Sequence, residues 1–286
     1  MTFNQRKSFS KREKRLSYYK LSEIELVFSR ACNLKCSFCP QSNPQYKKFT
    51  SGYMSFEVLK KIINDTKNQK LFYHIAGYGE PTINKNFLKF IKYIDNNINQ
   101  RSTYAITTNG IMFKKYFKEF YNVFKKLKKL EEIRISCYSN DIYNFFNRKK
   151  IDFISLKKDI NLDLFNNRAG SINLNKNNKF YSCNYAFFFL AIDIDGDVSP
   201  CPHEWKKQLK LGNIMNENIF NIWENKKINN LRKIFCENKR QEIYPCNICT
   251  AYGTLIGDKA KKDKCEYIKY TCKDKKRIYN DIKKNN

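Results

Sequence analysis

Apolar and polar positions alternate with two distinct periods along the first half of the chain. A period of two predicts β-strands, and apolar residues three or four positions apart predict amphipathic helices. The predicted strands lie at 23–29, 71–76, 103–107 and 133–137. The predicted helices lie at 55–63, 87–94, 113–127 and 140–149. Strand and helix thus alternate four times, which is typical of a parallel sheet with helices outside.

The length of this region limits the fold that it can form. A closed eightfold barrel typically needs about 250 residues, and a different pattern begins at Cys183. We therefore predict an α/β fold: a partial (β/α)6-type open barrel, with one or two of its strands in 150–182, and a small cysteine-rich C-terminal domain of β-hairpin and helix. The predicted divisions are a basic lead-in at 1–21, the barrel at 22–180, the cysteine-rich domain at 181–252 and a basic tail at 253–286.

The polar motifs of this region all follow predicted strands. A cysteine loop at 30–41 comes after the first strand, Gly-Tyr-Gly-Glu-Pro at 77–81 after the second, and Thr-Asn-Gly at 108–110 after the third, while Ser136 ends the fourth. Barrel folds carry their active sites at the C-terminal ends of the strands. We therefore expect these motifs to meet at one site, although the glycines taken singly are also ordinary turn residues.

Three cysteines stand close together in the first of these motifs. Cys32, Cys36 and Cys39 have the spacing C-x3-C-x2-C, which lets their thiolates hold one metal centre. A [4Fe–4S] cluster usually takes four cysteine ligands. Either a distant residue completes the set or one iron keeps an open coordination position. A zinc knuckle is the alternative that the spacing leaves open.

A second group of cysteines lies further along the chain. Apolar residues on both sides of Asp195-Gly196 predict a β-hairpin at 187–200, because Asp-Gly is a strong two-residue turn signal. The hairpin would bring Cys201 back beside Cys183. A C-x2-C pair downstream supplies Cys246 and Cys249. Four thiolates can thus meet, to hold either an iron–sulfur cluster or a structural zinc ion.

The net charge and the apolar runs limit the partners and the cellular location that we expect for the protein. Lys and Arg total 55 against 27 Asp and Glu, and the formal charge of +28 favours an anionic substrate or partner. These charges are spread along the whole chain, which disfavours nucleic acid as the partner. The N-terminus has no apolar leader segment, and the longest apolar run, 185–192, is too short to cross a bilayer. We therefore predict a cytoplasmic protein, without membrane contact, that keeps its cysteines reduced.

With Phe38 in the aromatic place of C-x3-C-x-aromatic-C, the first cysteine loop resembles that of the radical S-adenosylmethionine (SAM) enzymes. The resemblance implies that the three cysteines hold a [4Fe–4S] cluster whose fourth iron chelates SAM. It also implies that the strand-end residues bind this cofactor. Phe38 would flank the adenine, and Gly79 with Glu80 would engage the methionyl amino group. Asn109 and Ser136 would lie near the methionine carboxylate and the ribose.

Residues 183–249 resemble the SPASM/twitch extension of these enzymes, which carries auxiliary clusters. The resemblance implies one auxiliary [4Fe–4S] cluster with the ligands Cys183, Cys201, Cys246 and Cys249. The seven-cysteine form of the extension would continue beyond this set, but Leu255 occupies the next position. In dehydrogenases of the family an arginine in the region of Arg168 lies near the substrate, so we assign Arg168 a catalytic role. A solvated surface arginine is the alternative.

The resemblance implies an enzyme that reductively cleaves SAM to a 5′-deoxyadenosyl radical and takes a hydrogen atom from its substrate. We expect a small, anionic substrate, oxidation or epimerisation of a sugar, cyclitol or nucleotide-linked sugar, and a one-electron reductant such as flavodoxin or ferredoxin. A peptide-modifying enzyme of the same architecture and a non-catalytic metal-cluster protein that binds nucleic acid are the alternatives. Four cysteines lie outside the two groups: Cys137, Cys236, Cys265 and Cys272. Strand parity predicts that Cys137 faces the helices.

Overall fold

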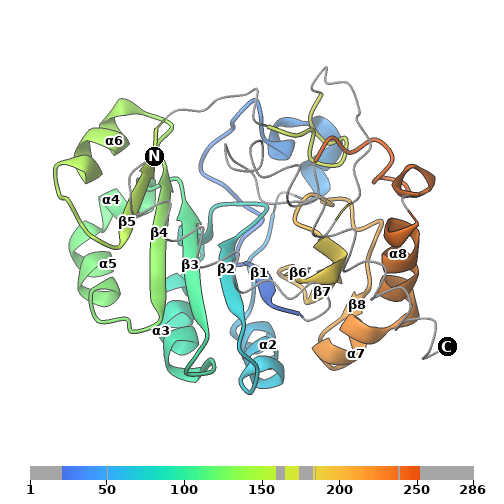
Figure 1. Ribbon diagram of the computed structural model, residues 1–286. Coiled ribbons are helices and arrows are strands. Elements are labelled where there is room, and N and C mark those ends of the chain that lie inside the picture. The colour runs from blue at the N-terminus through green and yellow to red at the C-terminus, as the bar shows by residue number, and fades with distance from the viewer. Residues whose placement is uncertain are drawn as a thin grey trace.

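One sheet of eight strands runs through the described part of the chain (Figure 1). The computed structural model describes residues 21–49, 51–158, 165–173, 183, 185–237 and 239–251, so Cys265, Cys272 and the predicted terminal segments lie outside it. The spatial order of the strands is β5-β4-β3-β2-β1-β6-β7-β8. Their bounds are β1 Glu23–Val27, β2 Phe72–Ala76, β3 Thr103–Thr108, β4 Leu130–Ser136, β5 Ile154–Lys157, β6 Phe189–Ile192, β7 Asp197–Ser199 and β8 Gly212–Asn213.

Each pair of adjacent strands in the order β5-β4-β3-β2-β1-β6 is parallel, which confirms the predicted open α/β barrel. β6 and β7 pair in antiparallel register around the turn at Asp195-Gly196, so the predicted hairpin is also confirmed. The first strand of this hairpin pairs with β1, with Leu26 opposite Ile192. The hairpin therefore extends the barrel sheet instead of standing apart from it. Hydrophobic periodicity cannot reveal this pairing because it joins segments that are far apart in sequence.

Seven α-helices accompany the sheet in the described residues. Their bounds are α2 Phe56–Thr66, α3 Phe87–Asn97, α4 Ile111–Lys115, α5 Phe117–Phe124, α6 Asn140–Asn147, α7 Ile219–Glu224 and α8 Lys226–Cys236. Ser55 caps α2 as predicted, because its hydroxyl accepts a hydrogen bond from the backbone of Val58. The single helix predicted at 113–127 is wrong. The backbone of Tyr116 leaves the helical region at φ −112° and ψ 40°, and the chain forms α4 and α5 on either side of it.

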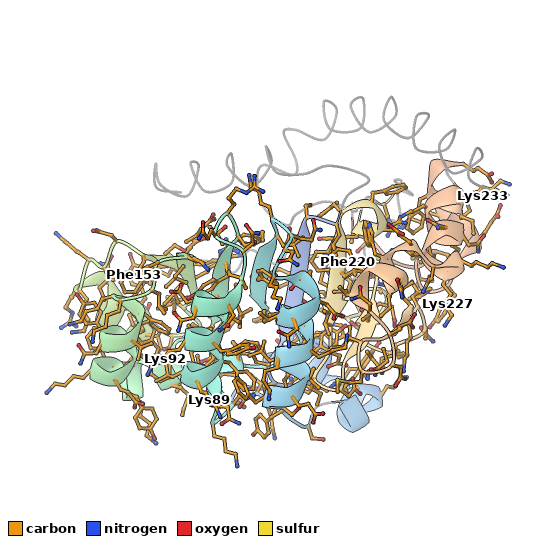
Figure 2. All side chains as sticks on the ribbon, turned by 90° about the horizontal axis from the view of Figure 1, so that it is seen from below. Lys89, Lys92, Phe153, Phe220, Lys227 and Lys233 are labelled. Atoms are coloured by element: carbon orange, nitrogen blue, oxygen red, sulfur yellow. The ribbon has the colours of Figure 1, made fainter. Side chains whose placement is uncertain are left out.

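The helices that follow β1, β2 and β3 pack side by side along the sheet and bury a continuous apolar core (Figures 1 and 2). Lys89 and Lys92 of α3, which are labelled in Figure 2, are both exposed. The break at Tyr116 sets α5 against α3, where the ring of Phe120 stacks on that of Phe87 with centroids 5.6 Å apart. None of the described helices is long and apolar enough to cross a membrane.

The other face of the sheet is polar and closed to solvent near β1. The alternation of acidic and apolar residues in β1 suggests one solvated face, but Glu23 and Glu25 are 2% and 5% exposed. His74 Nδ1 lies 3.6 Å from the Glu25 carboxylate, and His74 Nε2 lies 2.9 Å from the hydroxyl of Thr107. Because β1 has parallel neighbours on both sides, its second face lines the barrel interior rather than the solvent.

Candidate cluster-binding site

The first cysteine loop leaves the C-terminal end of β1 and folds back on itself. The backbone N–H of Cys39 donates to the carbonyl of Cys36 at 2.9 Å, and the N–H of Leu34 lies 3.4 Å from Cys32 Sγ. All three thiols of the loop are half-buried. Burial, with smaller contributions from Glu80, Cys39 and Cys36, raises the pKa of Cys32 to about 11, although the hydrogen bond from Leu34 opposes the rise. The fold thus gathers the three predicted thiols in one place at the mouth of the barrel.

Gly79 brings the loop after β2 into direct contact with the cysteine loop. A Cβ at this position would lie 2.3 Å from the Ala31 carbonyl oxygen and 2.5 Å from that of Ser29. The N–H of Glu80 also donates to the Ala31 carbonyl, at 2.9 Å. Only glycine allows the two backbones to approach this closely. The glycine is therefore needed for the packing of two loops, whether or not its backbone also contacts a cofactor.

The carboxylate of Glu80 ties the ends of β2 and β3 together. It accepts hydrogen bonds from the backbone and hydroxyl of Thr82, from the hydroxyl of Thr108 at 2.6 Å and from the N–H of Asn109 at 2.8 Å. Burial raises the pKa of Glu80, and these hydrogen bonds counteract the rise. The Glu80 side chain is thus occupied by protein donors, so its predicted contact with the SAM amino group remains a prediction.

Asn109 reaches from the end of β3 to the cysteine loop. Its Nδ2 donates to Asn33 Oδ1 at 2.7 Å and lies 4.0 Å from Cys32 Sγ. Ser136 at the end of β4 forms a hydrogen bond with the hydroxyl of Tyr138. Tyr138 is 42% exposed, and desolvation of its hydroxyl, followed by the nearby Cys36 and Cys39, raises its pKa. All four strand ends therefore converge on the three-cysteine group, as the sequence predicts.

Phe38, the predicted neighbour of the adenine, lies in an aromatic group that sequence reasoning did not identify. Its ring centroid is 5.7 Å from that of Tyr138 and 5.3 Å from that of Phe165. Tyr138 follows β4 by two residues and Phe165 lies in the segment before Arg168, so neither forms a local motif with Phe38. The three rings provide flat apolar surfaces of the kind on which a purine stacks.

Tyr78, which separates the two glycines after β2, connects the barrel with the chain beyond Cys201. Its ring lies 4.5 Å from the ring of Trp205, and its hydroxyl donates to the carbonyl of Glu204 at 3.1 Å. Tyr78 is buried, and burial raises its pKa well above the usual value. Tyr78 therefore connects the two cysteine-bearing parts of the fold.

The second cysteine group also assembles. Burial raises the pKa of Cys201 well above its usual value, and Cys246, Cys183 and Cys249 add to the rise because they lie nearby. The pKa of Cys246 rises to about 12, first by burial and then through Cys183. The N–H of Cys249 donates to the carbonyl of Cys246 at 3.3 Å, so the closing C-x2-C pair forms a tight turn. The four thiols thus meet although they come from three distant parts of the chain.

Residues 165–173 lie between the two cysteine groups and contact both sides. The amide of Asn43, just after the first cysteine loop, donates to the Ser171 carbonyl at 3.2 Å. The amide of Asn167 donates to the Ile248 carbonyl at 2.6 Å and accepts from the N–H of Thr250 at 2.9 Å. This segment therefore holds the two cysteine-bearing loops in a defined relation to one another.

Arg168 occupies the centre of that segment. Arg168, Ala169 and Gly170 all have positive φ, at 47°, 53° and 78°, and this tight turn presents the arginine. Its Nη1 lies 3.3 Å from Nδ1 of His203, and it is close enough to Cys39 to lower the pKa of that thiol, although burial dominates and raises it. Arg168 thus stands beside the first cysteine group while it contacts the residue two positions after Cys201.

The donor sets of the two cysteine groups suit iron–sulfur clusters, which bind cysteine thiolates. Among the described residues, no three Cys, His, Asp or Glu side chains form a group that could hold one ion. A cubane cluster separates its ligands because each thiolate binds a different iron. Three thiols at the strand ends suit a cluster with a free iron, and a set of four thiols suits a fully ligated one.

The fold and the two groups of thiols define a class: an open α/β barrel with two iron–sulfur sites of different completeness. Comparison with family models gives the same class. Residues 26–154 match the model of the radical SAM superfamily, and residues 183–250 match SPASM, described as an iron–sulfur cluster-binding domain. The chain therefore contains a radical SAM domain and a SPASM domain. These domains imply three cofactors: SAM, the [4Fe–4S] cluster that binds it, and an auxiliary iron–sulfur cluster.

Several known proteins resemble the chain over most of its length. The SAM-dependent 2-deoxy-scyllo-inosamine dehydrogenase of Niallia circulans is 25% identical over 244 residues, which cover 80% of this chain and 92% of that protein. The structure of BtrN in complex with AdoMet and 2-DOIA matches with a TM-score of 0.69 at 21% identity, covering 83% of this chain and 98% of BtrN. Streptococcus suis SuiB bound to the precursor peptide SuiA matches with a TM-score of 0.52 at 17% identity, covering 87% and 74%. The two structural matches show a shared fold.

Proposed function

We propose that the protein is a radical SAM oxidoreductase that oxidises a secondary alcohol of a sugar, cyclitol or nucleotide-linked sugar to a ketone. The placement of Arg168 between the two groups of thiols carries the proposal. A substrate held at Arg168 would lie within reach of both groups, one for hydrogen abstraction and one for electron transfer. The dehydrogenase activity named for the Niallia circulans relative supports the same reaction class.

We assign the seven cysteines as ligands: Cys32, Cys36 and Cys39 for the SAM-binding cluster and Cys183, Cys201, Cys246 and Cys249 for the auxiliary cluster. When bound, the first cluster and SAM supply the radical that removes one hydrogen atom from the substrate carbon. The net reaction converts SAM and the alcohol into methionine, 5′-deoxyadenosine, a ketone and one proton. The chain itself positions these groups: Gly79, Glu80 and Asn109 lock three loops together around the first cysteine group.

The pair of Arg168 and His203 provides donors for a substrate oxygen. Arginine can only donate, so Nδ1 of His203 accepts and its proton lies on Nε2. Burial, followed by the charges of Arg168 and Arg240, holds the pKa of His203 well below its usual value, so this histidine is neutral. Positive charge from two arginines favours an alkoxide-like or phosphate oxygen over an ammonium group. We therefore assign an anionic substrate and give Arg168 the role of binding its oxygen.

The placement of Cys137 favours oxidation over epimerisation. An epimerase needs a hydrogen-atom donor at the substrate, and a thiol is the usual one. Cys137 is 4% exposed and packs in the core between sheet and helices, as strand parity predicts. Among the cysteine side chains that the structure describes, it is the only one outside the two assigned groups. The described part of the chain therefore offers no thiol that could return a hydrogen atom.

The reaction needs a one-electron reductant to start it. We assign this role to flavodoxin or ferredoxin, which are acidic carriers and suit a chain with a formal charge of +28. A small-molecule substrate and a protein reductant are then the expected partners. The cytoplasm, where such carriers and free thiols are found, is the expected location.

Anaerobic reconstitution with iron and sulfide, followed by dithionite and SAM, tests the class of enzyme. We expect about eight irons per chain for two cubanes and formation of 5′-deoxyadenosine. The Cys32→Ala, Cys36→Ala, Cys39→Ala triple variant should keep about four irons and form none. Normal SAM cleavage by that variant would overturn the site. Salt-dependent retention of RNA or DNA with no SAM cleavage would instead support a nucleic-acid-binding protein.

The substrate site is tested separately with Arg168. A panel of cyclitols and nucleotide sugars, deuterated at the carbinol carbon, should identify a substrate whose label appears in 5′-deoxyadenosine. With that substrate, Arg168→Gln should keep substrate-independent SAM cleavage and lose ketone formation by about a hundredfold or more. Arg101→Gln, at an exposed position before β3, is the matched control. An Arg168→Gln variant with unchanged ketone formation would remove Arg168 from the site.

A further inference from the structure

Arg240 is a buried arginine that grips the closing cysteine pair of the auxiliary group. It is 3% exposed. Its Nε donates to the Cys246 carbonyl at 3.1 Å, Nη2 to the Cys249 carbonyl at 2.9 Å and Nη1 to the Ala251 carbonyl at 2.7 Å. These hydrogen bonds to the backbone of Cys246 and Cys249 thus fix the orientation of the planar guanidinium.

The charge of Arg240 lies close to all four auxiliary thiols. Burial alone would lower the pKa of Arg240, but Cys183, Cys249, Cys246 and Cys201 together raise it above the usual value. Arg240 in turn opposes the rise in the pKa of Cys246. A permanent cation therefore stands beside the whole thiol set rather than beside one member of it.

A cation in this position would stabilise the reduced auxiliary cluster more than the oxidised one. A cubane held by four thiolates is an anion, and uptake of one electron adds another negative charge. In a buried site, charges interact strongly because the surroundings screen them weakly, so a fixed cation stabilises the reduced form more than the oxidised form. Charge and hydrogen bonding around the ligands are known levers on cluster potentials.

We propose that Arg240 sets the reduction potential of the auxiliary cluster, raising it so that this cluster can accept the electron that the substrate releases on oxidation. That the electron comes from the substrate rests on the proposed function, but the reduction potential itself can be measured without SAM or substrate. Its failure would therefore leave the assignment as a radical SAM enzyme intact. Arg240 acts through the cluster and is a positioning and tuning residue.

Arg232 provides a matched control. It is also deeply buried, at 2% exposed. Its Nε donates to the Ala186 carbonyl at 2.9 Å, and its guanidinium lies 4.1 Å from the centre of the Trp223 ring. Its Nη1 also donates to Asn229 Oδ1 at 2.8 Å, within α8. Loss of this arginine removes a buried cation that is held by these contacts, whereas Arg240 is held by the backbone of the cysteine pair.

The test uses the full chain with Cys32, Cys36 and Cys39 replaced by Ala, so that only the auxiliary cluster contributes to the signal. Its midpoint potential is measured by redox titration with electron paramagnetic resonance for the parent, Arg240→Lys, Arg240→Gln, Arg240→Met and Arg232→Gln. Two neutral replacements are used because glutamine can still donate a hydrogen bond to the carbonyls that accept from Arg240, whereas methionine fills the space without a donor of its own. Iron content is determined for each variant before titration.

We expect the potential to shift to more negative values in both neutral variants and to stay near that of the parent in Arg240→Lys and Arg232→Gln. An unchanged potential in either neutral variant that keeps its cluster would overturn the proposal. An equal shift in Arg240→Lys and the neutral variants would also overturn it, because the charge would then be irrelevant. If both neutral variants lost the auxiliary iron while the rest of the chain stayed folded, Arg240 would be a structural brace and the proposal would fail.

Discussion

At the scale of single residues, the two positions after Tyr78 make the strictest demands on side-chain identity. Gly79 must lack a Cβ so that its loop can reach the carbonyls of Ser29 and Ala31. Glu80 must offer two oxygens because protein donors surround its carboxylate on both sides. Both residues act on the cysteine loop from the neighbouring strand, so their effects should appear in cluster binding as well as in stability.

Gly79→Ala should separate the loop after β2 from the cysteine loop, because the added methyl group would lie 2.3 Å from a backbone oxygen that cannot move alone. We expect the variant to lose the SAM-binding cluster and keep the auxiliary one, so iron should fall from about eight to about four per chain. Gly196→Ala, at a hairpin turn with φ +85°, is the control and should keep both clusters. Full iron content in Gly79→Ala would show that the loops can adjust.

Glu80→Gln should weaken the metal-free protein by about 1–3 kcal/mol, because the amide group would face donors that now reach a carboxylate oxygen. Chemical denaturation measures this loss. Glu57→Gln, on the exposed face of α2, should change stability by less than about 0.5 kcal/mol. Equal stability of Glu80→Gln and the parent would mean that the four hydrogen bonds contribute nothing net.

At the scale of elements, the hairpin β6–β7 and the cysteine loop after β1 are joined by a buried ion pair. Arg30 Nε donates to Asp193 Oδ1 at 2.9 Å, and the two side chains are 10% and 6% exposed. Lys207 Nζ lies 3.3 Å from the same carboxylate. The partners Arg30 and Asp193 are 163 positions apart in the sequence. The ion pair therefore connects the loop that carries the first cysteines with the strand that leads toward the second group.

Asp193→Asn should destabilise the fold by about 3–5 kcal/mol, because it leaves a buried arginine without its buried, directly hydrogen-bonded carboxylate. Thermal or chemical unfolding of the metal-free chain measures the loss. Asp195→Asn is the matched control, since that carboxylate is 50% exposed and 3.8 Å from Arg30, and it should cost about 0–1 kcal/mol. If both variants lost the same stability, the pair would not be a specific link between the two elements.

At the scale of the whole molecule, one continuous sheet carries both cysteine groups. The first group follows β1, and β6 and β7 lie between Cys183 and Cys201 in the sequence, with β6 beside β1. Tyr78 on Trp205 and Asn167 on Thr250 add two contacts across the same region. Metal bound at either group should therefore stabilise the whole fold rather than a local loop.

Removal of the clusters should cost more stability at high pH than at neutral pH. In the metal-free protein the folded pKa of Cys32 is raised from 9.0 to about 11, so its contribution to stability is present below pH 9.0 and is lost as the pH rises toward 11. Loaded protein has no thiol proton to lose. The difference in melting temperature between loaded and metal-free protein should therefore grow as the pH rises through about 9. A metal-free chain with all seven ligand cysteines replaced by Ala is the control and should lack this dependence.

Local signals in the sequence were enough to predict much of this protein. Alternating apolar residues predicted the strands, the Ser55 cap and helical spacing predicted α2, and Asp195-Gly196 predicted the hairpin, because each depends on residues that are neighbours along the chain. The C-x3-C-x2-C spacing predicted the first metal-binding group for the same reason, whereas the second group was predicted from the hairpin, the C-x2-C pair and the resemblance to a known family. The break at Tyr116 was missed because helical spacing continues across it.

Tertiary structure alone decided how distant segments meet. The placement of β6 beside β1, the burial of Glu25 in the barrel, the contact of Tyr78 with Trp205 and the position of Arg240 beside four thiols leave no mark on local periodicity. A polar residue has the same sequence signature whether it faces water or a closed polar interior. Only the packing of complete elements removes the water, and that removal turns ordinary glutamates and arginines into buried groups whose charges act strongly on their neighbours.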